Sequence, residues 1–213
     1  PCNHGGGANV SPNIAAASEF DDVKEIVRFF DFHLMGMDNG LDKSPRVYYY
    51  TMGENIWKTS DVWPIAAERK QLYLTGGGSA DWNPSAEVED ITAYTVDTTQ
   101  TVGLDSRWSF ETNRTGITYS DASSEDSITV VFTLAELTED LEITGHPQVN
   151  LYLKSATADG SVFVYLEDVD EAGNVWKVTD GQFRFVHRKL HETAPHYKDV
   201  VTYHSYLKVD ALP

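Results

Sequence analysis

The sequence has a single cysteine, Cys2, among its 213 residues, so a disulfide framework within the chain and a thiolate zinc site are both excluded. Basic residues are scarce, since 16 Lys and Arg stand against 33 Asp and Glu and give a formal net charge of −17. Such a chain repels polyanions, and nucleic acid is therefore a poor partner. No stretch approaches the roughly 18 to 20 apolar residues that cross a bilayer, so we expect no membrane partner.

Hydrophobic residues make up 41% of the sequence, which is enough to bury a core in one large β domain or in two smaller units. The acidic residues are scattered rather than gathered in a tail, and this pattern predicts a solvated surface on a soluble protein. The compartment, cytoplasmic or secreted, stays open. The oligomeric state also stays open, and a homo-oligomer is compatible with the sequence.

An amphipathic helix is predicted over residues 19–35. Ser18 is a suitable N-cap and Gly36 a natural stop. Apolar residues recur at steps of three and four along this segment: Phe20, Val23, Ile26, Val27, Phe30 and Leu34. The aromatic run 46–52 then predicts a strand, and a helix followed by a strand is typical of the end of an α/β unit. We place a domain boundary near Pro64.

Beyond Pro64 the pattern is that of short strands separated by turns. Strands are predicted in four segments, "QLYLT", "SITVVFTL", "PQVNLYLKS" and the final "DVVTYHSYLKV". Residues 161–190 predict two extended arms about "DEAGN", where Gly173 and Asn174 would supply positive backbone angles. No second helix of comparable quality follows Gly36. The pattern favours a mostly β fold, an antiparallel jelly-roll β-sandwich.

His4 is the candidate catalytic residue, because it stands against three glycines that would let a substrate approach its ring. On the pattern alone, a solvent-exposed loop histidine is the favoured interpretation. No nucleophile is visible: the segment Gly77–Asp81 lacks the last glycine of a Gly-x-Ser-x-Gly elbow and follows a β strand. The chain alone therefore cannot form a complete catalytic triad.

Two patterns resemble metal sites, and for both we prefer the interpretation without metal. The stretch "DVDEAG" at 168–173 imitates the start of a calcium loop, but Ala172 and Thr179 stand where oxygen ligands are required, so a hairpin is favoured. Four histidines, at positions 187, 191, 196 and 204, have spacings that need not converge on one ion. We expect no metal and no cofactor.

The five tryptophans are compatible with a different function, carbohydrate binding. They are Trp57, Trp63, Trp82, Trp108 and Trp176. Aromatic side chains on a β-sandwich can stack on sugars, so a non-catalytic carbohydrate-binding module is an alternative. Large aromatic side chains more often anchor cores and interfaces, and we favour that interpretation.

Several segments together resemble one family. "RFFDFHLMG", "VYYYTMGENIW", "LEITGHP", "LEDVDEAGN" and "VTDGQFRF" occur here in that order, and nearly the whole chain resembles the C-terminal third of the Xaa-Pro dipeptidyl-peptidase and cocaine esterase family of serine hydrolases. The resemblance implies an α/β-hydrolase domain that carries Ser, Asp and His in chain order, followed by a jelly roll of the galactose-binding-like type. His4 falls on the position of the catalytic histidine, and the Ser and Asp would precede Pro1.

Two departures accompany the resemblance. The family tends to have Trp where Cys2 stands, which affects the packing behind the His4 loop. Relatives also continue past the equivalent of "KVDALP" with a strand that completes the jelly roll, so we expect both ends of this chain to be cut and the jelly roll to be incomplete.

From these observations we predict two regions: residues 1–64 as the end of an α/β-hydrolase domain, and residues 65–213 as an incomplete jelly roll. The intact protein would be a serine hydrolase that acts on a small-molecule ester or a short peptide, with only His4 of its triad present here. Whether the substrate is an ester, a proline-containing peptide or a β-lactam side chain stays open.

Overall fold

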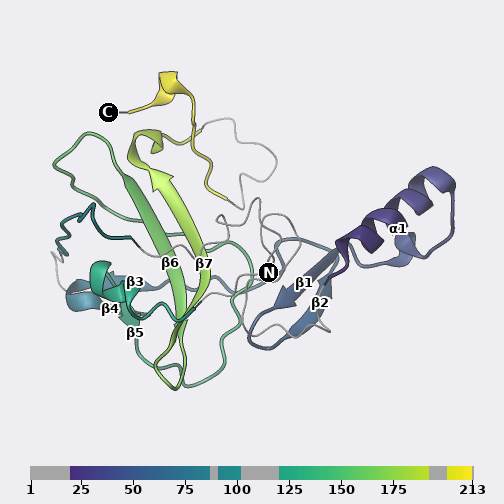
Figure 1. Cartoon of the computed structure of the whole chain (residues 1–213), viewed down its shortest axis with the longest axis horizontal. Helices are drawn as coiled ribbons and strands as arrows, with labels where there is room; N and C mark the ends of the chain where they lie inside the picture. The colour runs from purple at the N-terminus through teal and green to yellow at the C-terminus, as the bar shows by residue number, and fades with distance from the viewer. Residues whose placement is uncertain (1–19, 87–90, 102–119, 192–200, 213) are drawn as a thin grey trace. The chain divides into compact units, whose positions relative to one another are not determined.

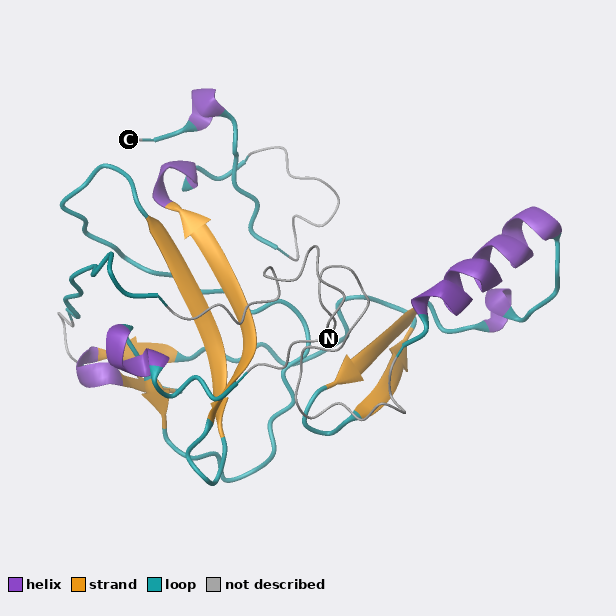
Figure 2. Cartoon of the chain, in the orientation of Figure 1, coloured by secondary structure: helices purple, strands orange, loops and turns teal. Residues whose placement is uncertain are grey.

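Strands are the main regular structure of the protein. The computed structural model describes residues 20–86, 91–101, 120–191 and 201–212. Within these ranges one α-helix and seven strands are joined by loops and short 3₁₀ turns (Figures 1 and 2). The predicted β-rich class is therefore confirmed. The chain divides into two compact units, Pro1–Ile143 and Thr144–Pro213, and each is described by itself.

Helix α1 spans Asp22–Met35. Its N-cap is Asp21, whose carboxylate accepts a hydrogen bond from the backbone N–H of Lys24 at 2.9 Å. The helix therefore begins three residues later than predicted, because Asp21 supplies the cap; Ser18, the predicted cap, lies outside the described residues. The predicted stop is confirmed, since Gly36 adopts the left-handed conformation with φ 66°.

Strands β1 (Val47–Thr51) and β2 (Ile56–Ser60) form an antiparallel hairpin. The strand predicted over 46–52 is confirmed by β1. Trp57 packs against Tyr50 and against Phe20, with ring centroids 5.3 and 5.5 Å apart. The ammonium of Lys58 lies 2.6 Å from a carboxylate oxygen of Glu142, which ties β2 to a segment far away in the sequence.

A second small sheet contains β3 (Tyr73–Thr75), β4 (Ser79–Asp81) and β5 (Thr133–Leu134). Strands β3 and β4 are antiparallel and are joined by the turn Gly76–Gly78, as the glycine run predicts. Strand β5 pairs with β4 in parallel. The sheet is therefore mixed, whereas the sequence pattern predicts antiparallel pairing.

The longest strands, β6 (Ser161–Val169) and β7 (Val175–Arg184), form the antiparallel hairpin predicted about "DEAGN". Figure 1 shows them as the two long green arrows. Gly173 has the predicted positive φ, 84°. The prediction for Asn174 is wrong, because the one non-glycine residue with positive φ in the described ranges is Asn55.

Four of the predicted strands are wrong or shortened. Of residues 71–75 only β3 is a strand. Residues 147–155 form no strand, and of residues 127–134 only β5 does. In the final stretch the described part contains one isolated bridge, between His204 and Leu190. An alternating apolar pattern indicates which side chains share a face, but a strand also requires a backbone partner, which the pattern does not specify. The jelly roll and the α/β remnant therefore stay predictions.

Burial is modest in the described residues. The buried apolar side chains there are Ala80, Ala122 and Val175, while most larger apolar side chains are half-buried or exposed. No α-helix follows α1 in these ranges, as predicted. None of their helices has both the length and the apolarity that crossing a bilayer requires.

Candidate functional site

His4, the predicted catalytic residue, lies outside the described residues. Its role as a general base therefore stays a prediction from the sequence and from the family resemblance. The structure does describe the other candidates that the sequence raised: Ser79, the loop around Asp170, three of the four histidines and four of the five tryptophans.

Ser79 stands in a β-hairpin rather than in a nucleophile elbow. It begins β4 with an extended backbone, φ −103° and ψ 156°. An elbow serine instead sits on a strained turn between a strand and a helix, which exposes its hydroxyl to an oxyanion hole. The local geometry supports the interpretation that the nucleophile of a triad is not Ser79.

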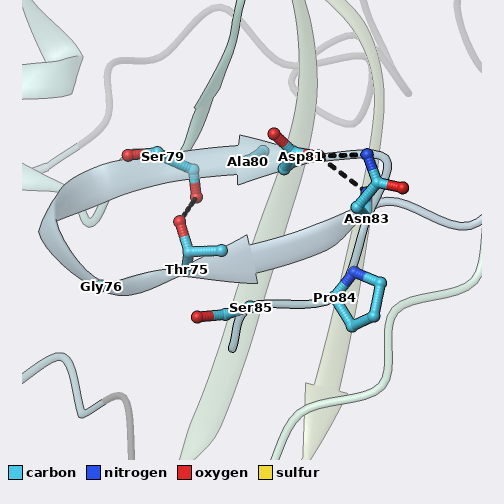
Figure 3. Close-up of a pocket in the computed structure, with 8 residues that line it drawn as sticks. All are labelled: Thr75, Gly76, Ser79, Ala80, Asp81, Asn83, Pro84 and Ser85. Carbon is cyan, nitrogen blue, oxygen red and sulfur yellow. Dashed lines mark hydrogen bonds between the residues drawn. The ribbon is translucent and has the colours of Figure 1, made fainter. Parts of the chain in front are cut away.

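A hollow of about 650 Å³ lies beside this hairpin (Figure 3). It is lined by Thr75, Gly76, Ser79, Ala80, Asp81, Asn83, Pro84 and Ser85. Its polar groups largely bind one another: Thr75 donates to the carbonyl of Ser79 at 3.1 Å, and Asp81 accepts from the backbone N–H of Asn83 at 2.7 Å. Among the described residues, this lining includes no imidazole that could activate a hydroxyl.

The Asp170 loop is a hairpin turn held by one carboxylate. Oδ1 accepts from the backbone N–H groups of Ala172 and Asn174, each at 2.9 Å. Oδ2 accepts from the Asn174 amide at 2.8 Å and from the Trp176 indole at 3.0 Å. These donors, the Asn174 side chain first and the Trp176 indole next, lower the pKa of Asp170 to about 2. Both oxygens are thus engaged by protein donors, and the predicted hairpin is confirmed.

Asp170→Asn is expected to lower the melting temperature of the chain by roughly 2–4 °C near neutral pH, because an amide group cannot accept four hydrogen bonds through one oxygen. The wild-type carboxylate contributes fully above its unfolded pKa of about 3.9. That contribution is lost as the pH falls toward the folded pKa of about 2. Melting curves between pH 2 and pH 6 measure both effects.

Asp168→Asn is the matched control for this prediction, since Asp168 is an exposed acid two residues away on β6. We expect its melting temperature to stay within about 1 °C of wild type, as is usual at exposed positions. If the melting temperature falls equally in the two variants, the hydrogen bonds of Asp170 do not stabilise the chain and the prediction is wrong.

The histidines do not gather into a metal site in the part of the chain that the structure describes, where no group of three or more potential ligands is found. Each of the three described imidazoles of this group packs on a different aromatic ring. The ring pairs are His187 with Tyr206, His191 with Tyr203, and His204 with Phe183, at centroid distances of 5.0, 5.4 and 4.6 Å. His196 lies outside the described residues.

The described tryptophans contact side chains of their own fold. Trp63 lies 6.2 Å from Tyr49, ring centroid to ring centroid, and Trp57 lies between Phe20 and Tyr50. The ammonium of Lys70 lies 5.8 Å from the ring centroid of Trp82. These contacts support the packing interpretation over a sugar-stacking platform. Trp108 lies outside the described residues.

Comparison with known proteins places these features in a family. The model of the X-Pro dipeptidyl-peptidase C-terminal non-catalytic domain matches residues 39–211. A Mycobacterium bovis protein named as a serine esterase is 39% identical over 219 residues, which cover 100% of this chain and 34% of that protein. Cocaine esterase of a Rhodococcus species is 25% identical over 171 residues, 76% of this chain and 30% of the esterase. The chain thus spans about one third of the length of these curated relatives. No solved structure matches it.

Proposed function

Because the chain belongs to the family of the X-Pro dipeptidyl-peptidase C-terminal non-catalytic domain, we propose that it is the C-terminal part of a serine hydrolase that cleaves an ester or an amide. The observation that carries this proposal is the match, over the full length of the chain, to a mycobacterial protein named as a serine esterase. The family inferred from the sequence motifs is confirmed by the same comparisons.

In this proposal His4 is the proton carrier of a Ser–His–Asp triad. It removes the proton from the serine hydroxyl as that oxygen attacks the carbonyl carbon, and it returns the proton to the leaving group as the carbon–heteroatom bond breaks. A water molecule then repeats the cycle on the acyl-enzyme. The aspartate holds the imidazole in the required tautomer. The serine and the aspartate belong to the part of the hydrolase that precedes Pro1.

Residues 1–64 form the end of the α/β-hydrolase domain in this proposal, and residues 65–213 form the jelly roll. The exposed apolar face of α1 supports the assignment of residues 1–64 to a larger domain. Its apolar side chains, Val23, Ile26, Phe30 and Leu34, are 65%, 53%, 49% and 74% exposed, and such a stripe on a helix normally packs against a sheet or another helix. In this proposal Trp57 and Trp63 contact both domains, and their exposure of 42% and 45% leaves surface for that contact.

Two proteins test this function: the complete hydrolase and the 213-residue chain. We expect the complete hydrolase to cleave p-nitrophenyl esters or Xaa-Pro anilides and to be labelled by a fluorophosphonate, a reagent that modifies activated serines. The 213-residue chain alone should do neither. Labelling of the chain alone would place the nucleophile within it and would contradict the assignment.

A carbohydrate-binding module is the competing function, and a glycan array distinguishes it from the hydrolase. The packing of the described tryptophans against their own fold gives us no reason to expect retention of any glycan. Retention of one class of glycan by the 213-residue chain, together with no esterase or peptidase activity in the complete protein, would replace the proposed function by the alternative.

A further inference from the structure

Asparagine followed by glycine occurs once in the sequence, at Asn39 and Gly40. The pair lies between α1 and β1 (Figure 1), just before the short 3₁₀ turn η2, Leu41–Lys43. Each of the other eight asparagines precedes a residue that carries a side chain. Glycine has no Cβ atom, so the backbone nitrogen of Gly40 can approach the Asn39 side-chain carbonyl with the least steric hindrance. A reaction between an asparagine side chain and the following nitrogen is therefore most favoured here.

The fold holds the Asn39 side chain over the backbone that follows it. Its Oδ1 accepts a hydrogen bond from the backbone N–H of Leu41 at 3.3 Å, and the nitrogen of Gly40 lies between these two groups along the chain. The side-chain carbonyl carbon, Cγ, is therefore held close to the Gly40 nitrogen. The same hydrogen bond polarises the carbonyl group and makes Cγ more electrophilic. Both effects favour attack of the Gly40 nitrogen on Cγ.

The backbone nitrogen of Gly40 is the attacking group in such a reaction. In the part of the chain that the structure describes, Gly40 makes hydrogen bonds through its carbonyl, which accepts from Lys43 N at 3.2 Å and from the Ser44 hydroxyl at 3.0 Å. Its N–H donates to no acceptor among these residues. The attack therefore breaks no hydrogen bond of this nitrogen.

Two Asp–Gly pairs, which begin at Asp159 and Asp180, have the same spacing, but the fold restrains both. The Arg184 guanidinium donates to Oδ2 of Asp159 at 2.9 Å and lowers the pKa of this carboxyl. Asp159 therefore stays ionised, and a carboxylate is a poor electrophile. Asp180 and Gly181 lie within β7, where pairing with β6 holds the backbone extended. Of the three pairs, the one at Asn39 is thus the most reactive.

The nitrogen that would leave Asn39 makes a contact that stabilises the fold. Nδ2 of Asn39 donates to the backbone carbonyl of Arg28 in α1 at 2.7 Å, and this hydrogen bond ties the loop to the helix. The guanidinium of Arg28 donates to the Ser44 hydroxyl at the other end of the same loop. A carboxylate in place of the amide removes the donor and sets a negative charge beside the Arg28 carbonyl oxygen, which is unfavourable.

We propose that Asn39 is a site of spontaneous deamidation, which removes the hydrogen bond between this loop and α1. The Gly40 nitrogen attacks Cγ of Asn39, and the Cγ–Nδ2 bond breaks. Nδ2 leaves as ammonia with the proton of the Gly40 N–H, and a cyclic succinimide remains. Water then hydrolyses the ring: cleavage between nitrogen and Cγ gives aspartate, and cleavage between nitrogen and the backbone carbonyl carbon gives isoaspartate. Neither product can donate to the Arg28 carbonyl. This modification does not depend on the proposed hydrolase function.

Incubation of the 213-residue chain at pH 8 and 37 °C, followed by tryptic digestion and mass spectrometry, tests the site. We expect peptide 29–43 to gain the mass difference between a hydroxyl and an amino group, and to separate by chromatography into aspartate and isoaspartate forms. Peptide 155–177 is the internal control and should keep its mass, because Asn174 precedes the β-branched Val175. Gly40→Ala should slow the conversion several-fold, since the methyl group hinders the attack. A Cβ atom there meets nothing within 4 Å.

A synthetic peptide of residues 36–46 gives the rate of conversion without the fold. The site is overturned if peptide 29–43 from the incubated chain keeps its mass over a time in which the synthetic peptide converts fully.

Asn39→Asp reproduces one product and measures its effect on the fold. We expect its melting temperature to be about 2–4 °C below that of wild type, because the hydrogen bond to Arg28 is lost. Asn150→Asp adds the same charge at an exposed position and should melt within about 1 °C of wild type. If Asn39→Asp melts as Asn150→Asp does, deamidation does not weaken the link between the loop and α1, and this part of the proposal is wrong.

Discussion

Replacing His4 by alanine in the complete hydrolase is expected to lower kcat by roughly 10⁴- to 10⁶-fold and to leave KM within a few-fold of wild type. Without the imidazole, no group takes the proton from the serine hydroxyl during attack, and none delivers it to the leaving group. Substrate binding depends on the walls of the pocket rather than on this proton transfer. Steady-state kinetics with a p-nitrophenyl ester measure both constants.

His33→Gln is the control for this variant, because His33 is an exposed imidazole on α1 and has no role in the proposed triad. Its kcat should stay within about twofold of wild type, and both variants should melt at similar temperatures. A His4→Ala enzyme that keeps most of its activity would show that another residue is the base and would remove His4 from the mechanism.

Replacing Gly78 by alanine is expected to reduce the free energy of unfolding by about 2–3 kcal/mol. Gly78 has φ 82°, where an L-residue costs roughly 1–2 kcal/mol. A Cβ atom at this position would also lie 3.0 Å from the carbonyl oxygen of Val131. Because that contact is with the backbone, relief requires movement of residues next to β5. Urea denaturation followed by tryptophan fluorescence measures the loss.

A variant at the neighbouring Gly77 distinguishes the two causes of the lost stability, backbone strain and the contact with Val131. Its φ is 75°, almost the same as that of Gly78, but a Cβ atom there would meet nothing within 4 Å. Gly77→Ala should therefore cost only the backbone strain, about 1–2 kcal/mol. If both variants lose the same stability, the contact with Val131 is relieved without cost and the steric argument fails.

Local features of the fold could be predicted from the sequence, because local chemistry determines them. Gly36 ends α1 and Gly173 turns the β6–β7 hairpin, as predicted, since both positions need a positive φ. Where two neighbouring residues are both suited to a helix cap or a turn position, the sequence does not indicate which of them takes it. Asp21 caps the helix three residues after the predicted cap, and Asn174 contributes hydrogen bonds to Asp170 rather than a positive φ.

Non-local features could not be predicted in the same way. Residues 147–155 alternate as a strand does, yet they form none, and Tyr152 in this segment is fully exposed. The parallel pairing of β5 with β4 joins residues more than 50 positions apart, and no periodicity indicates such a partner. The candidate catalytic residue was found through the family motifs, because a glycine-rich loop with one histidine does not identify a base without its nucleophile.

The β6–β7 hairpin, with the turn at Asp170, also has a consequence for the order of folding. Its ladder joins residues that are close in sequence, from Val169 with Val175 at the turn to Ser161 with Arg184 at the open end, so little loop-closure entropy opposes its formation. Hairpins of this kind form in about 1–10 μs, far faster than most long-range pairings. We therefore expect this hairpin to form early in the folding of its unit, before the contacts between segments that are distant in sequence.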